Sequence, residues 1–183
     1  MDKKFVYLIF IFIATALILI TGCTENKSNE ANANVTESPK EQESSQDYGA
    51  DYYFVLGYTE FENKNYNRSV EYLDKAIELN PMHYEAYNLR GFIYGEKKDY
   101  DSAIKDFGKA IELNENYTEA YNNRGFTLFL KQEYEPALVD FDRAIELNPN
   151  YSRSWLGRAV TLEKLNRTDE ALEAYEKVTE LSK

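Results

Sequence analysis

The chain has 183 residues and is acidic, with 21 Lys and Arg against 32 Asp and Glu and a formal net charge of -11. A field of this sign repels phosphate backbones, so the composition argues against a nucleic acid as the partner. The chain holds one Cys and one His. Neither a disulfide framework nor a His/Cys metal site can therefore be assembled within it, and no cofactor is predicted.

Residues 1–22 are predicted to be an export signal. Two lysines precede an apolar run over residues 5–20, and small residues then lead to Cys23, the single Cys of the chain. Small side chains let a peptidase approach the backbone, and the thiol can accept a lipid. The pattern resembles that of exported prokaryotic lipoproteins, which implies cleavage after residue 22 and a lipid on Cys23. The alternative is an uncleaved anchor helix, because the run approaches the length of a bilayer span.

Residues 23–49 are predicted to be the lipidated Cys followed by a disordered tether. Residues 24–49 contain almost no large apolar side chains. Such a segment cannot bury enough apolar area to offset the loss of chain entropy. Either reading of the first segment leaves the rest of the chain on the extracytoplasmic side of a cell membrane.

From residue 50 onward the sequence repeats every 34 residues without insertion or deletion. Small residues recur at position 8 of each unit, as Gly57, Gly91, Gly125 and Ala159, and at position 20, as Ser69, Ala103, Ala137 and Ala171. Aromatic residues recur at position 4, as Tyr53, Tyr87, Tyr121 and Trp155. Small residues let helices cross at close range, and large ones fill the space that remains. The four units are 50–83, 84–117, 118–151 and 152–183.

This pattern resembles the tetratricopeptide repeat family. The resemblance implies an all-α fold, an α-solenoid of four helical hairpins and eight helices stacked as a right-handed superhelix over residues 50–183. Position 28 is Ile in the first three units but Thr179 in the last, which suits an end that no hairpin covers. Leu172 and Tyr175 are still present in that unit, so a homodimer through the last hairpin is also compatible with the sequence.

Position 7, where the family usually has an apolar residue, carries Arg90, Arg124 and Arg158. A lone buried charge is very costly, so we predict structural ion pairs with Asp106 and Asp140 at position 23. Pairing within units would join Arg90 to Asp106 and Arg124 to Asp140. Pairing between neighbours would join Arg124 to Asp106 and Arg158 to Asp140, and the sequence does not choose. The competing interpretation is that the three Arg form an anion-binding row.

The resemblance also implies a binding surface on the first helix of each hairpin, at positions 2, 5, 9, 12 and 13. Carried over to this chain, these positions include Leu130 and Leu156. From them we select as predicted partner-binding residues Phe54, Tyr58, Phe61, Asn88, Phe92, Asn122, Phe126, Phe129 and Arg153. Acidic residues flank the aromatic ones, so we predict a groove for another protein or peptide that carries apolar residues and Lys or Arg. The alternative is that several of these rings pack against neighbouring hairpins.

Two narrower sites are disfavoured. Family members that clamp the carboxylate of a chaperone tail use Lys and Asn in one repeat, Asn in the next, then Lys and Arg. The corresponding residues here are Asn88, Phe92, Asn123, Arg153 and Gly157, of which Asn123 matches and Arg153 is a rough equivalent. No catalytic or phosphate-binding motif is present in the sequence. His83 falls at a turn and is predicted to lie at the surface, and no metal site is predicted.

These observations predict a non-enzymatic interaction scaffold, lipid-anchored at the outer face of a cell membrane, for the assembly of an envelope or surface complex. The alternative function is that of a peptide- or glycan-binding lipoprotein for nutrient capture or cell-wall remodelling.

Overall fold

The computed structural model of the chain describes residues 48–183. The predicted signal segment, the predicted lipid site at Cys23 and the tether up to residue 47 lie outside the described residues. The described part consists of helices and turns, without strands. Its helices are α2 (Ala50–Glu62), α3 (Tyr66–Leu79), α4 (Tyr84–Glu96), α5 (Tyr100–Leu113), α6 (Thr118–Leu130), α7 (Tyr134–Leu147), α8 (Ser152–Lys164) and α9 (Thr168–Leu181).

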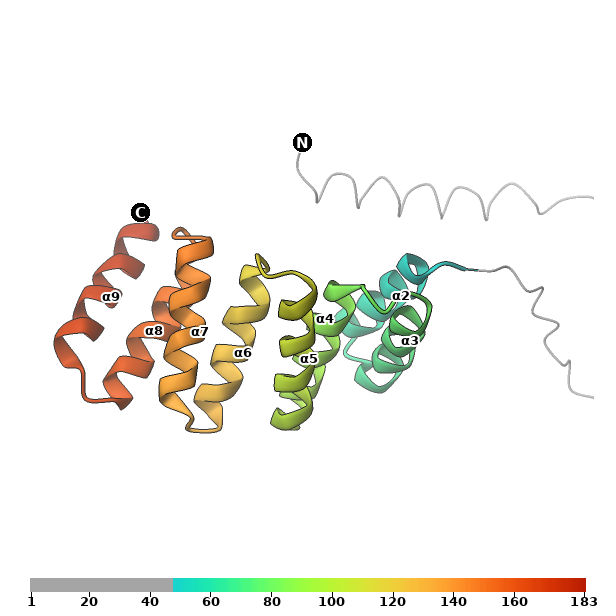
Figure 1. The fold of residues 1–183 in the computed structure, drawn as a ribbon, viewed down its shortest axis with the longest axis horizontal. Coiled ribbons are helices and arrows are strands. Elements are labelled where there is room, and N and C mark those ends of the chain that lie inside the picture. The colour runs from blue at the N-terminus through green and yellow to red at the C-terminus, as the bar shows by residue number, and fades with distance from the viewer. Residues whose placement is uncertain (1–47) are drawn as a thin grey trace, which may run out of the picture. The chain divides into compact units, whose positions relative to one another are not determined.

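Consecutive helices pair into four hairpins, which lie side by side in chain order from α2–α3 to α8–α9 (Figure 1). The second helix of each hairpin packs against the first helix of the next, as α3 does on α4, α5 on α6 and α7 on α8. Each hairpin therefore contacts only its neighbours, as expected for a solenoid. The predicted all-α solenoid of four hairpins is confirmed.

The turn inside each hairpin contains one residue with a left-handed backbone conformation. One residue per repeat adopts a left-handed conformation with φ between 57° and 65°, namely Lys64, Lys98, Gln132 and Asn166. Residues with a Cβ rarely adopt this conformation, although it is common at the ends of helices. Because the conformation recurs at position 15 in three different residue types, the geometry of the hairpin turn determines it.

The turns between the first three hairpins and their successors depend on Asn. Asn80, Asn114 and Asn148 end α3, α5 and α7 in an extended conformation. In each, the side-chain oxygen accepts a hydrogen bond of 3.0 to 3.1 Å from the backbone N–H two residues further on. This local bond competes with the helix and turns the chain towards the next hairpin.

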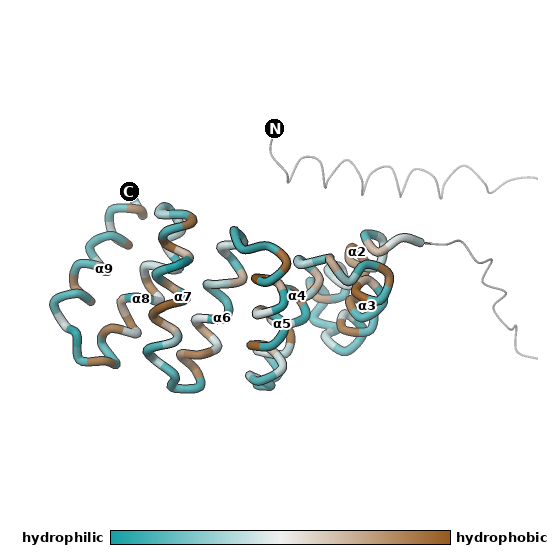
Figure 2. Tube along the Cα trace, viewed as in Figure 1, coloured by the Kyte–Doolittle hydropathy of each residue, from teal (hydrophilic) through white to brown (hydrophobic). Residues whose placement is uncertain are grey.

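The core follows from the small residues of the repeat. A Cβ added at Gly57, Gly91 or Gly125 would lie 2.9 to 3.0 Å from the side chain at position 24 of the same unit, which is Leu73, Phe107 or Phe141. These three large side chains are fully buried. Figure 2 shows hydrophobic positions recurring along every helix, as such a core requires. None of the helices over residues 48–183 combines the length and apolar character needed to cross a bilayer.

The prediction that His83 lies at the surface is wrong. Its side chain is buried, and its ring packs on Phe54 with 4.7 Å between ring centroids. The nitrogen Nδ1 lies 3.1 Å from Glu85 and Nε2 lies 3.4 Å from Asp51, but neither contact has hydrogen-bond geometry. The residue occupies the last position of its repeat, directly before α4, where the chain passes beneath the start of α2.

Candidate interaction surface

The structure forms the Arg–Asp pairs within repeats. The Arg90 guanidinium donates hydrogen bonds of 2.7 and 2.8 Å to the two oxygens of Asp106. Arg124 donates bonds of 2.8 and 2.7 Å to Asp140 in the same way. Such two-pronged contacts suit the planar guanidinium and satisfy both oxygens of a buried carboxylate. The repeat-internal alternative is therefore the one that the structure adopts.

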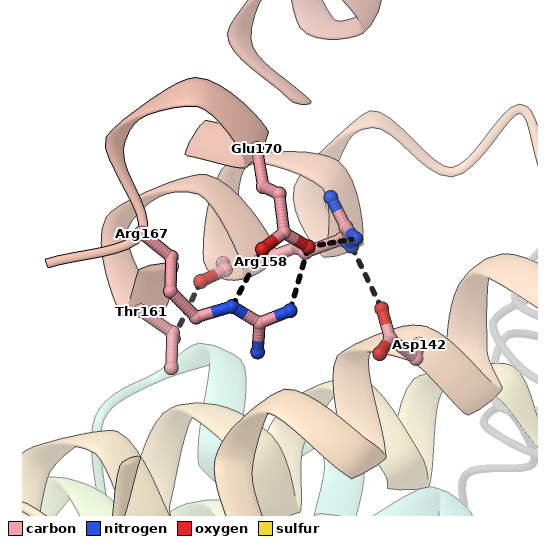
Figure 3. Close-up of polar contacts among 6 residues, drawn as sticks. Asp142, Arg158, Thr161, Arg167 and Glu170 are labelled. Atoms are coloured by element: carbon pink, nitrogen blue, oxygen red, sulfur yellow. Dashed lines mark hydrogen bonds and ion pairs between the residues drawn. The ribbon is translucent and has the colours of Figure 1, made fainter. Parts of the chain in front are cut away.

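A second carboxylate, which the sequence analysis missed, reaches these Arg from the preceding hairpin. Asp74 bonds to Arg90, and Asp142 accepts a bond of 2.8 Å from Arg158. Both Asp occupy position 25, where the second repeat has Gly108 and the fourth has Glu176. Pairing within units would have left Arg158 without a partner. In the structure Arg158 lies between Asp142 and Glu170 (Figure 3). Glu170 is 3.9 Å from Arg158 and also binds Arg167.

These contacts favour a structural role for the three Arg over an anion-binding row. Burial lowers the pKa of Arg90, but its bonds to Asp106 and Asp74 raise the pKa by more, so that the net shift is upward. The bond to Asp140 likewise raises the pKa of Arg124 against the opposing effect of burial. Guanidinium groups that already face carboxylates have little capacity to attract a further anion.

Several predicted partner-binding aromatics pack against other rings of the stack. Phe61 lies edge-on to Phe92 at 5.6 Å between centroids, and Phe129 lies 5.5 Å from Tyr134. Phe126 lies 4.9 Å from the buried Phe141. The predicted rings among these, together with Phe54 on His83, are half-buried. Of these ring contacts only that of Phe61 with Phe92 joins neighbouring hairpins, as the packing alternative requires, while the others lie within one repeat. The ring of Tyr58 is exposed and lies 6.2 Å from that of Phe61.

The two predicted Asn are bonded inside the stack. Asn122 is buried, and its side-chain oxygen accepts a bond of 3.1 Å from Ser154, so it joins α6 to α8 instead of being open to a partner. Asn88 donates to the hydroxyl of Tyr117 at 3.2 Å and accepts from Asn123 at 3.1 Å. Burial is the main cause that raises the pKa of the Tyr117 hydroxyl, which therefore stays neutral.

A hollow of about 360 Å³ on α4, α6 and α8, which we call the central hollow, brings part of the predicted site together. Its lining includes Phe92, Asn122, Phe126 and Arg153 from the predicted partner-binding residues. It also includes Leu130 and Leu156, which the same family positions give but which were not among those residues. The side chains of Leu130 and Leu156 are 56% and 42% exposed. They occupy positions 13 and 5, so the family pattern already contained the signal. The remaining lining residues are Gly95, Glu96, Phe107, Asn123 and Thr127.

Phe54, Tyr58, Phe61, Asn88 and Phe129 are not part of this lining. A larger hollow of about 520 Å³ lies against α7, α8 and α9 and is lined mainly by charged residues, among them Asp142, Arg158 and Lys177. Arg158 is already bonded to Asp142 there. The central hollow is better suited to an apolar ligand group, because its lining is mostly apolar and its two Leu are accessible.

The serial hairpins and the accessible apolar hollow define a helical-repeat protein of the interaction-scaffold class. Tetratricopeptide repeat models match residues 50–83, 84–117, 118–151 and 141–173, which together is more than half of the chain. The chain belongs to the tetratricopeptide repeat family.

Solved structures share this fold. The crystal structure of MamA is 25% identical over 73% of this chain and 78% of its own, with a TM-score of 0.69. The first tetratricopeptide domain of Spaghetti (RPAP3), solved with the HSP90 peptide SRMEEVD, is 26% identical over 64% of this chain and 93% of its own, with a TM-score of 0.63. The Arabidopsis OM64 domain is 22% identical over 63% and 96%, with a TM-score of 0.62. No curated protein matches the chain significantly.

Proposed function

We propose that this protein is a non-enzymatic scaffold that binds a polypeptide segment in the central hollow. A lipid on Cys23 anchors it at the outer face of a cell membrane, where it serves the assembly of an envelope or surface complex. The observation that carries the binding proposal is the exposure of Leu130 and Leu156 beside the half-buried rings of Phe92 and Phe126. A solvent-accessible apolar cluster of this kind marks a binding site more often than a solvated face. The peptide held by the Spaghetti domain supports the same class of ligand.

The charges around the hollow indicate the rest of the partner's chemistry. Glu96 and Arg153 lie in the lining and balance each other in charge, while Glu85 and Glu119 add acidic groups in the first turns of α4 and α6. The chain as a whole carries a net charge of -11. Such a field attracts basic segments and speeds their encounter. The partner segment therefore has an apolar side chain for the hollow and Lys or Arg beside it.

Replacing Leu130 and Leu156 together by Gln should weaken peptide binding about tenfold, because the loss of roughly 1.4 kcal/mol of apolar contact corresponds to that factor. The probe is a peptide selected on the wild-type protein from a random-peptide display library and measured by fluorescence anisotropy. Helical content and melting temperature should stay at the wild-type values, since both side chains are exposed.

The matched control replaces Val139 on α7 and Leu172 on α9 by Gln. Both side chains are more exposed than those of Leu130 and Leu156, and neither lies in the central hollow. This control should bind the peptide as the wild type does. Equal weakening in both pairs, or wild-type binding by the Leu130→Gln, Leu156→Gln variant, would refute the assignment of the hollow.

Lipid attachment at Cys23 should be visible in the intact mass of the full-length protein purified from its own membranes. We expect the wild type to lack residues 1–22 and to carry additional mass from the lipid, because the thiol is the acceptor. The Cys23→Ser variant should have the unmodified mass of the whole chain. A wild-type protein with the mass of an intact, unmodified chain would instead favour the uncleaved anchor helix.

A further inference from the structure

The chain contains six Asn-x-Ser/Thr triplets, which neither the repeat nor the central hollow explains. This triplet, with any residue except Pro in the middle, is the acceptor sequence for N-linked glycans. With 16 Asn and 19 Ser or Thr among 183 residues, about two such triplets are expected by chance. Two of the six begin at Asn26 and Asn34, outside the described residues. The other four begin at Asn67, Asn116, Asn150 and Asn166.

Three of these four triplets present their Asn in a turn. Asn116 and Asn150 lie in the turns that join α5 to α6 and α7 to α8, and Asn166 lies in the turn between α8 and α9. All three residues are exposed. Within residues 48–183 no hydrogen bond engages any of their side-chain amides. Each amide is therefore open to an enzyme that approaches the folded chain.

The hydroxyl at the third position of these three triplets is also accessible. Thr118 and Ser152 are partly exposed at the first positions of α6 and α8, and Thr168 is exposed at the first position of α9. None of the three hydroxyls is bonded to another group of the described stack. Because the acceptor sequence requires the hydroxyl as well as the amide, both of its ends can be recognised here without unfolding.

Asn67 carries the same triplet where the folded chain does not offer it. It lies in the first turn of α3, and its side-chain oxygen accepts a bond of 3.0 Å from Lys97. The third position of this triplet is Ser69, which is fully buried and donates a bond of 2.6 Å to the carbonyl of Gly57. Recognition of this triplet would require the start of α3 to unfold, so the chain contains its own control site.

The exposed triplets leave the central hollow free. Asn116 and Asn150 both occupy position 33 of their repeats, and the two turns that carry them lie at the same edge of the stack (Figure 1). Neither these two residues nor Asn166 belongs to the lining of the central hollow. A glycan on any of them would replace none of the contacts that the hollow offers to a peptide.

We propose that the exported chain is N-glycosylated at Asn116, Asn150 and Asn166 and is unmodified at Asn67. The inference rests on the extracytoplasmic location in the proposed function, because acceptor triplets are used in exported chains. The sugar donor is a lipid-linked oligosaccharide. Nδ2 of the Asn forms a bond to C1 of the first sugar, and the bond from C1 to the phosphate oxygen of the lipid carrier breaks. The carrier leaves with that oxygen, and the amide gives one proton to a base of the transferase, so nothing is oxidised or reduced.

Mass spectrometry of the full-length protein purified from its own membranes tests the proposal. Asn116→Gln, Asn150→Gln and Asn166→Gln should each remove the mass of one glycan, while Asn67→Gln, the control, should remove none. Thr118→Ala should remove the glycan from Asn116, whereas Thr118→Ser should keep it, which a change of the Asn alone, such as deamidation, would not show. Since the three Asn are exposed and unbonded, their variants should melt like the wild type.

The same spectra report on residues 1–22 and on the lipid at Cys23, so the two proposals fail separately. Glycans add equally to the wild type and to the Cys23→Ser variant, and the lipid is still read from their difference. A processed, lipidated chain without a glycan at the three sites would overturn the glycosylation and leave the anchor standing. A glycosylated chain that keeps residues 1–22 and lacks the lipid would do the reverse. Equal modification of Asn67 would also overturn the assignment, because exposure in the fold would then not select the sites.

Discussion

Replacing Gly157 by Ala should destabilise the last hairpin by roughly 3 kcal/mol, the upper end of what an added methyl group costs in a packed core. A Cβ at this position of α8 would lie 2.3 Å from Cε1 and 2.5 Å from Cζ of Phe141. The ring of Phe141 is fully buried and cannot swing away. Either α8 moves off α7 or the ring leaves its place, and both expose apolar surface.

Thermal melting and hydrogen exchange measure this effect. Because each hairpin contacts only its neighbours, exchange should speed up most in α8 and α9 and least in α2 and α3. The matched control is Gly108→Ala in α5, where the added Cβ has Arg124 Nη1 nearby at 3.8 Å. That change should stabilise the protein by about 0.5 to 1 kcal/mol, because Gly in a helix interior is entropically unfavourable.

Shortening the side chain of Phe141 should restore part of the stability that Gly157→Ala loses. Phe141→Leu alone should be destabilising, but it should recover part of the loss when combined with Gly157→Ala, since the two changes compete for the same space. Additive losses, or a Gly157→Ala variant that melts like the wild type, would show that α7 and α8 do not approach each other in this way.

Gly157 illustrates why the fold was predictable while one of its tightest contacts was not. The recurrence of Gly57, Gly91 and Gly125 at position 8 is a periodic signal, and periodicity is what identified the repeat. Gly157 stands at position 6, where the other repeats have Val, Leu and Asn. A single Gly without recurrence carries no pattern, so its contact with the Phe of the preceding hairpin emerged only from the structure.

Among the ion pairs, too, the contacts between recurring residues were predictable and the others were not. Arg at position 7 and Asp at position 23 recur, and a buried charge needs a partner, so the sequence predicted the members of both pairs. Gly108 interrupts the acidic residues of position 25, which hid Asp74 as a second partner of Arg90 and Asp142 as the partner of Arg158. Asp140 lies in the same repeat as Arg124 and Asp106 in the preceding one. The sequence could not choose between them, because it does not say how far apart adjacent hairpins lie.

The candidate site was predictable to the level of a helix face. The family positions marked the helices that line the central hollow and included Phe92, Phe126 and Arg153. They could not separate rings that pack inward from side chains open to solvent, because both occur at the same helical spacing. The burial of His83 was missed for a related reason, since a residue in a turn can still be covered by a helix from the preceding hairpin.

Replacing Arg124 by Met should cost about 3 kcal/mol, since breaking a buried ion pair leaves an uncompensated charge behind. Both oxygens of Asp140 accept their bonds from this guanidinium, and the Asp140 side chain is only 4% exposed. Met fills much of the space of the Arg stem but donates no hydrogen bond. The carboxylate would thus remain in the core without its counter-ion, and denaturant unfolding should report the loss.

Arg158→Met is the matched control, because its partner Asp142 has a side chain that is 47% exposed. Water can solvate that carboxylate once the Arg is gone, so this variant should lose about 1 kcal/mol or less. Combining Arg124→Met with Asp140→Leu removes the stranded charge and should restore most of the stability, as apolar replacements of buried pairs do elsewhere. Equal losses for Arg124→Met and Arg158→Met would mean that the burial of the acid does not determine the cost, and would remove the physical basis for treating these Arg as structural.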